Sequence, residues 1–175
     1  MPSGQNANVK KMVYAALFAA LTGIGSWIAL PLPYVSVTLQ TLFTILSGAV
    51  LGPYFGALSM IVYVLLGLIG LPVFSRGQSG LGVLFGQSGG YLIGFILAPI
   101  AIGLIVRMKE KPGYWWYCLA LAIGILIIDA CGVVQLSIVT GLPIDKAILV
   151  GALVFVPTDI LKVLIGAYIA RKIQL

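Results

Sequence analysis

Apolar residues run through this chain in six stretches, which are separated by short polar, proline- or glycine-containing segments. A helix needs about 20 predominantly apolar residues to cross a bilayer, and most of the stretches approach that length. The pattern therefore predicts six transmembrane helices, at 12–30, 39–51, 54–71, 91–108, 115–139 and 148–169. The second stretch is too short for an upright span, and we expect it to be tilted or partly buried in protein.

The longest connection, residues 71–95, joins the third and fourth expected helices. Its glycines are interleaved with an apolar group, Val83, Leu84 and Phe85. Glycine permits turns with positive φ and close backbone approach, so the segment is typical of an ordered outer loop that folds over the helix ends. A merely flexible connector is the alternative.

Composition agrees with a membrane location. The chain is 61% hydrophobic and 8% charged, whereas soluble domains average about 25% charged residues. We therefore expect an all-α polytopic membrane protein with one domain over residues 1–175. The polar residues 1–11 form its expected N-terminal tail, and no cleavable leader is indicated.

Basic residues are distributed unequally between the two sides of the expected bundle. On the side of the termini lie Lys10, Lys11, Arg107, Lys109, Lys111, Arg171 and Lys172. The opposite loops hold only Arg76 and Lys146. Because cytoplasmic loops carry an excess of Lys and Arg, both termini are expected in the cytoplasm of a multi-pass plasma-membrane protein.

Residues for catalysis are scarce. The sequence has no histidine, and its single glutamate, Glu110, falls in an expected cytoplasmic loop. Cys118 and Cys131 share one expected helix and make a poor metal site. A small membrane enzyme is the runner-up class, but we expect no catalytic residues, no metal and no cofactor.

Three ionisable residues lie within expected membrane helices: Asp129, Asp159 and Lys162. Such residues are rare and usually functional. Asp159 and Lys162 lie three positions apart on one helix face, after Pro157, which we expect to weaken the backbone. Together they could bind a small amphipathic molecule with a ureido or amide group and a carboxylate. A self-satisfied ion pair that only sets packing is the alternative.

Two further positions could line the same pocket. Gln40 belongs to a polar stripe at the start of the second stretch, whose hydroxyls could instead bond their own backbone. Tyr91 follows Gly89 and Gly90, whose bare amides at a helix start could hold an anion. Tyrosine at a helix end is also an ordinary interfacial residue.

Small residues form two stripes on the first expected helix. Ala15 and Ala19, and Ala16 and Ala20, are each four positions apart. Such spacing lets helix backbones approach closely, either within this chain or against a separate protein.

Three motifs together resemble the biotin-specific substrate-binding subunit of energy-coupling-factor (ECF) transporters. They are "VTLQTLFTILSGAVLGPYFGALSM", "GLIGLPVFSRGQSGLGVLFGQSGGYLIGF" and "FVPTDILKVLIGAYIA". The resemblance covers nearly the whole chain, in the same order. It implies a six-helix protein that binds biotin from outside and delivers it with a transmembrane coupling subunit and two cytoplasmic ATPase subunits.

The resemblance also assigns residues. It implies substrate binding by Arg76, Gln78, Tyr91, Asp159 and Lys162, to which the polar stripe adds Gln40, and contacts with the coupling subunit at Ala15, Ala16, Ala19 and Ala20. This chain departs from the family pattern at Arg76, Gln87 and Asp129, which leaves open an altered pocket or a close biotin relative. A solitary facilitator, or a proton-coupled carrier for biotin or a related ureido acid, is the alternative function.

Overall fold

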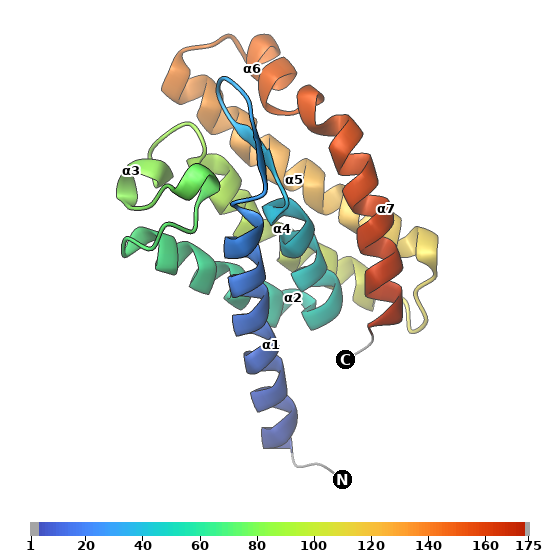
Figure 1. The fold of residues 1–175 in the computed structure, drawn as a ribbon. Helices are drawn as coiled ribbons and strands as arrows, with labels where there is room; N and C mark the ends of the chain where they lie inside the picture. The colour runs from blue at the N-terminus through green and yellow to red at the C-terminus, as the bar shows by residue number, and fades with distance from the viewer. Residues whose placement is uncertain (1–3, 174–175) are drawn as a thin grey trace.

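The computed structural model describes residues 4–173, which are mostly helical (Figure 1). The helices are α1 (Gly4–Gly25), α2 (Gln40–Leu68), α3 (Leu81–Leu84), α4 (Gly89–Arg107), α5 (Tyr114–Thr140), α6 (Ile144–Gly151) and α7 (Val156–Lys172). Two short 3-10 turns, η1 (Ser75–Gly77) and η2 (Leu153–Phe155), and two strands, β1 (Ala29–Pro31) and β2 (Ser36–Thr38), complete the described part. Within it, four helical segments are long and apolar enough to cross a membrane: Gln40–Leu68, Gly89–Arg107, Tyr114–Thr140 and Ile144–Lys172.

Helix α1 differs from the first expected span at both ends. It already begins at Gly4, so residues 4–11 of the expected tail are helical, while residues 1–3 lie outside the described part. It ends at Gly25 instead of Leu30. At this end the Ser26 hydroxyl donates to the Gly23 carbonyl at 2.7 Å. The apolar residues that follow form strand β1.

Strands β1 and β2 form an antiparallel hairpin that the sequence pattern did not predict. Ala29 lies opposite Thr38, and Pro31 lies opposite Ser36. The fold is thus mostly, but not purely, helical. Pro31 and Pro33 have no N–H to donate, so the segment that holds them cannot continue as a regular helix.

Helix α2 is two antiparallel arms joined at a sharp turn. Gly52 has φ 81° and ψ −177°, a conformation that favours glycine, and Pro53 follows it. The arms lie side by side, since the Thr44 hydroxyl contacts the sulfur of Met60 at 3.3 Å. These arms correspond to the expected stretches 39–51 and 54–71. The first arm is largely buried, as its short length indicated.

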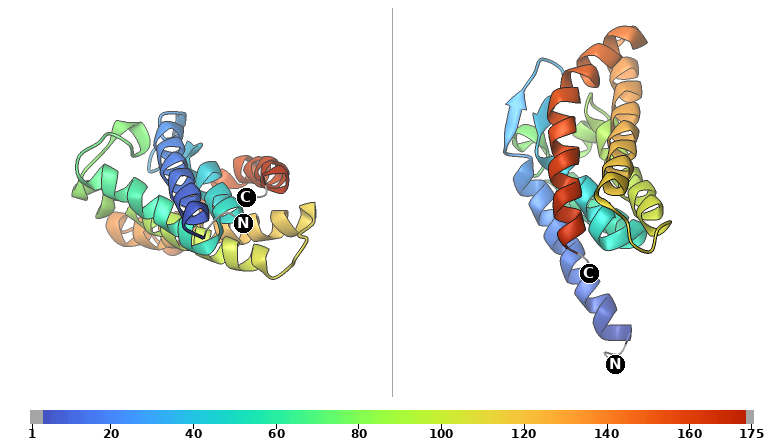
Figure 2. Two further views of the ribbon diagram at one scale, coloured as in Figure 1. Left: turned by 90° about the horizontal axis from the view of Figure 1, so that it is seen from below. Right: turned by 90° about the vertical axis from the view of Figure 1, so that its right-hand side faces the viewer.

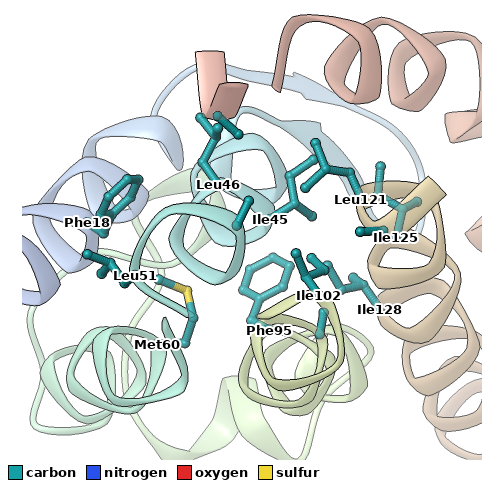
Figure 3. Close-up of a cluster of buried hydrophobic side chains, with 14 of the residues drawn as sticks. Phe18, Ile45, Leu46, Leu51, Met60, Phe95, Ile102, Leu121, Ile125 and Ile128 are labelled. Carbon is teal, nitrogen blue, oxygen red and sulfur yellow. The ribbon is translucent and has the colours of Figure 1, made fainter. Parts of the chain in front are cut away.

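The core lies where α2 crosses α1 and α4, and where α4 packs on α5. Figure 3 shows side chains from these helices meeting there, among them Phe18, Ile45, Met60, Phe95 and Ile128. Glycines bring the backbones together: a Cβ on Gly48 would lie 2.6 Å from the Cα of Pro99 on α4.

The last expected span is broken into α6 and α7. Helix α6 ends at Gly151, η2 follows, and α7 begins at Val156. Pro157 lies in the first turn of α7, where a backbone N–H has no helical acceptor in any case. Pro157 therefore starts a helix, and the expectation that it weakens one is wrong.

The ends of the elements define two ends of the molecule. The first turn of α1 and the last turn of α7 lie at one end, and the β-hairpin and α6 lie at the other (Figure 1). In the right-hand view of Figure 2, α7 lies between the hairpin and α5.

Candidate ligand-binding site

A cavity of about 500 Å³ lies between the β-hairpin, the loop before α4, and the first turns of α2, α4 and α7. All six residues that the sequence assigned to substrate binding line it: Gln40, Arg76, Gln78, Tyr91, Asp159 and Lys162. They come from four segments that are far apart in sequence, and the fold brings them together around one space.

Asp159 and Lys162 form an ion pair on the wall of this cavity. The Lys162 Nζ lies 2.9 Å from Asp159 Oδ1, and each residue is 7% exposed. Asp159 is in the first turn of α7, where the partial positive charge of a helix start favours a carboxylate. The pair leaves the second carboxylate oxygen and two ammonium protons for a ligand.

Asp129 lines the same cavity from α5. It is half-buried, and it adds a second carboxylate to the cavity lining. A ligand in this cavity therefore meets hydrogen-bond acceptors from two helices and a donor from Lys162. Groups with several N–H donors fit such an arrangement.

Gln40 belongs to a chain of hydrogen bonds behind the cavity. The Thr38 hydroxyl donates to Gln40 Oε1 at 2.9 Å, and Gln40 Nε2 donates to the Tyr63 hydroxyl. Tyr63 in turn donates to the Val73 carbonyl at 3.1 Å. One N–H and one oxygen lone pair of the Gln40 amide stay available for a ligand.

The expected polar stripe divides between two surroundings. Thr38, Gln40 and Thr41 line the cavity, whereas Thr44 contacts Met60 inside the α2 hairpin. Thr44 lies one helical turn beyond Gln40 on the same face of the first arm, and so deeper in the α2 hairpin.

Tyr91 presents its ring to the cavity while its hydroxyl is bonded elsewhere. The hydroxyl donates to the Gly151 carbonyl at 2.6 Å, and the ring stands edge-on to Phe155. The anion site expected at Gly89 and Gly90 stays a prediction, and the structure shows that both glycines are closely packed. Added Cβ atoms would lie 1.7 Å from the Leu84 carbonyl oxygen and 2.2 Å from a carbonyl oxygen of α5, so these glycines serve close packing.

The loop over the cavity is held at several points. Phe74 and Gln78 form an isolated β-bridge that closes the η1 turn. Gln135 on α5 donates from Nε2 to the carbonyls of Leu84 and Gly86, at 2.7 and 2.8 Å. The residues between η1 and α4 therefore have a defined path over the helix ends.

Apolar residues that the sequence did not single out complete the cavity wall, among them Val35, Phe74, Phe95 and Phe155. No signal distinguishes them, because an apolar residue within an apolar stretch has the same pattern whether it faces lipid, core or ligand.

The two alanine stripes of α1 lie on different faces of the helix. Ala15 and Ala19 are 3% and 2% exposed and belong to the core, whereas Ala16 and Ala20 are exposed. Residues one position apart on a helix point in directions about 100° apart, so the two stripes cannot share a surface. The expectation that all four alanines contact a partner is therefore wrong for Ala15 and Ala19.

Comparison with known proteins accounts for this arrangement. The BioY family model matches residues 2–175. This chain belongs to the BioY family. Members of that family named as biotin transporters match it over nearly their whole length. Transport is the role named for them, and the expectation that the chain is not an enzyme is confirmed.

Two relatives and one solved structure illustrate the similarity. The biotin transporter BioY of Thermotoga maritima is 42% identical over 166 residues, which is 95% of this chain and 96% of that protein. The probable biotin transporter BioY of Pyrococcus horikoshii is 37% identical, over 94% and 96% of the two chains. The crystal structure of an S-component for biotin from an ECF-type ABC transporter superposes with a TM-score of 0.89 at 28% identity, covering 98% of this chain and 93% of that one.

Proposed function

We propose that this chain is the biotin-binding, substrate-specificity subunit of an ECF-type uptake transporter. The observation that carries the proposal is the buried Asp159–Lys162 pair, which opens into a cavity with both polar and apolar walls. Biotin has ureido N–H donors, an apolar bicycle and a carboxylate. The cavity offers acceptors, aromatic and aliphatic walls, and cationic donors to match these groups.

The proposed binding residues contribute in different ways. Asp159 and Lys162 supply the charged contacts, Tyr91 supplies a ring face, and Gln40 and Gln78 supply amides. Asp129 adds a further acceptor. Arg76 lies at the same cavity, but its Nε and Nη2 already donate to the β-hairpin.

The proposed membrane arrangement has six spans in one domain. The spans are α1, the two arms of α2, α4, α5, and α6 together with α7. Both termini then lie on one side, together with most of the basic residues, which supports a cytoplasmic location for the termini in the plasma membrane. The cavity lies at the opposite end, open to biotin from outside.

The proposed partners are a transmembrane coupling subunit and two cytoplasmic ATPase subunits. Ala16 and Ala20 support this assembly, because they leave a flat, exposed strip on α1 against which a partner helix could pack closely. A carrier driven by protons through Asp129 and Asp159 is the second candidate. Uptake that collapses when the proton gradient is dissipated, with ATP maintained, would favour it.

Isothermal titration of the purified protein with biotin tests the binding function. One-to-one binding is expected, and lipoic acid, which has a similar acid tail but no ureido group, should not compete. Absence of biotin binding at micromolar concentrations would contradict the proposal and would direct the search to other ureido acids.

A further inference from the structure

Arg76 has an unusual backbone conformation for a residue with a side chain. Its φ is 61° and its ψ is 26°, and among residues 4–173 it is the one non-glycine residue with a positive φ. In this left-handed region the Cβ crowds the following carbonyl oxygen. Residues persist there when the surrounding structure over-determines them, often at functional positions.

The Arg76 side chain spans from η1 to the β-hairpin. Nε donates to Ser36 Oγ at 2.8 Å, and Nη2 donates to the Leu32 carbonyl at 2.5 Å. Ser36 is the first residue of β2, and Leu32 lies in the loop between the two strands. A guanidinium has several donors in a fixed planar fork, so one side chain can bind both acceptors at once.

The η1 side of this contact is firmly attached to the helices. Phe74, directly before η1, is 1% exposed and stands edge-on to Tyr63 of α2. Its ring also covers Gly67, whose carbonyl accepts a hydrogen bond of 2.8 Å from Gly80. The turn that carries Arg76 is therefore anchored to the packed core through Phe74.

The hairpin is attached to the helices mainly at its base and through two buried residues, Val35 and Thr38. Its strands pair only with each other, and Leu30 and Tyr34 are 62% and 40% exposed. Yet the segment from Pro33 to Thr38 forms one wall of the cavity. The position of this hairpin therefore decides how far the cavity is covered.

We propose that Arg76 is a positioning residue that holds the β-hairpin against η1, and thereby slows the release of a ligand from the cavity. The two hydrogen bonds of the Arg76 side chain join the hairpin, which is the weakly attached wall of the cavity, to the firmly attached η1 turn. The inference rests on the proposed function for the identity of the ligand. The contact between η1 and the hairpin itself does not depend on a ligand.

The substitution Arg76→Gly separates the effect of the side chain from the effect of the backbone conformation. Glycine adopts the left-handed conformation without strain, so this variant loses the two hydrogen bonds and keeps the turn. We expect its thermal stability to be no lower than that of the parent protein. Arg76→Lys, which keeps the charge but not the fork, should be intermediate, and Arg171→Ala in the last turn of α7 is the matched control.

The first measurement needs no ligand. Spin labels at Leu30→Cys and Leu81→Cys, two exposed positions, report the distance between the hairpin and the loop on a background in which Cys118 and Cys131 are replaced by alanine. Arg76→Gly should broaden the distance distribution toward longer distances. A distribution identical to that of the parent would overturn the inference.

The second measurement separates positioning from direct recognition. Dissociation rates are compared for biotin and for biotin amide, whose acid group is uncharged. Arg76→Gly should accelerate the release of both by at least roughly fivefold, the scale of one ordinary hydrogen bond, because the two bonds of Arg76 are exposed. Acceleration for biotin alone would mean that Arg76 binds the ligand carboxylate, and it would overturn the positioning role.

The two measurements also keep the proposals apart. If the parent protein does not bind biotin, the proposed function fails, while the label distances still decide whether Arg76 holds the hairpin. If biotin binds but neither the distances nor the release rates respond to Arg76→Gly, the positioning role fails and the proposed function stands.

Discussion

The hydroxyl of Tyr91 donates a hydrogen bond of 2.6 Å to the carbonyl of Gly151, and so joins the start of α4 to the end of α6. The contact requires a glycine, because a Cβ at residue 151 would lie 2.8 Å from the hydroxyl oxygen. The chain leaves helical geometry immediately afterwards, at Ala152, and starts again as α7. This bond therefore helps to place the helix start that carries Asp159.

Tyr91→Phe should lower stability more than it lowers affinity. The variant keeps the ring at the cavity but leaves the Gly151 carbonyl without its donor, which costs about 1 kcal/mol. Thermal unfolding should show a lower midpoint, and titration should show a biotin affinity within about threefold of the parent. A tenfold or larger loss of affinity with unchanged stability would instead place the hydroxyl on the ligand.

Asp159→Asn should weaken biotin binding by at least roughly tenfold, about 1.4 kcal/mol, because it removes a buried charged acceptor and leaves Lys162 unpaired. Isothermal titration measures the change. Asp145→Asn, at an exposed position in the first turn of α6, is the matched control and should leave affinity unchanged. Affinity of the Asp159 variant within twofold of the parent would remove this residue from the site.

Gly103→Ala should destabilise the protein by at least about 1 kcal/mol. An added Cβ would lie 2.2 Å from the backbone nitrogen of Pro53, and backbone cannot move aside cheaply. Gly113→Ala is the matched control, since no atom lies within 4 Å of its added Cβ. Chemical denaturation of both variants tests this, and equal stability would show that α2 and α4 can separate at little cost.

Ala20→Trp and Ala19→Trp should have different effects. Ala20 is exposed, so the bulky side chain should leave biotin binding intact and prevent co-purification with a coupling subunit. Ala19 is 2% exposed in the core, so the same change there should unfold the isolated chain. Full co-purification of a folded Ala20→Trp variant would exclude this strip as the partner interface.

Much of the helical arrangement could be predicted because it depends on local apolar length. The positions of α4 and α5 agree with the expected stretches within a few residues. The brevity of the stretch at 39–51 indicated that it is tilted or partly buried in protein, and the structure shows the burial. The ionisable residues Asp159 and Lys162 stood out because an apolar setting makes charge conspicuous.

Features that depend on tertiary contact could not be predicted. The β-hairpin has strands of three residues each, too short for an alternating pattern. The inward direction of Ala15 and Ala19 depends on where α2 lies, and both alanine stripes have the same spacing. The hydrogen bond from the Tyr91 hydroxyl to the Gly151 carbonyl could not be predicted, because it depends on the helix break after Gly151. That break lies within a continuous apolar stretch.

The sharp turn at Gly52 has a consequence for how the chain folds. It brings Thr44 and Met60, which are only 16 positions apart in sequence, into contact. The contacts of α4 with α5 and of α5 with α7 can form only after the later helices have been made. Closing a short loop sacrifices less chain entropy than closing a long one. The two arms of α2 can therefore pair as soon as both have been synthesised, and they offer a preformed surface on which the remaining helices assemble.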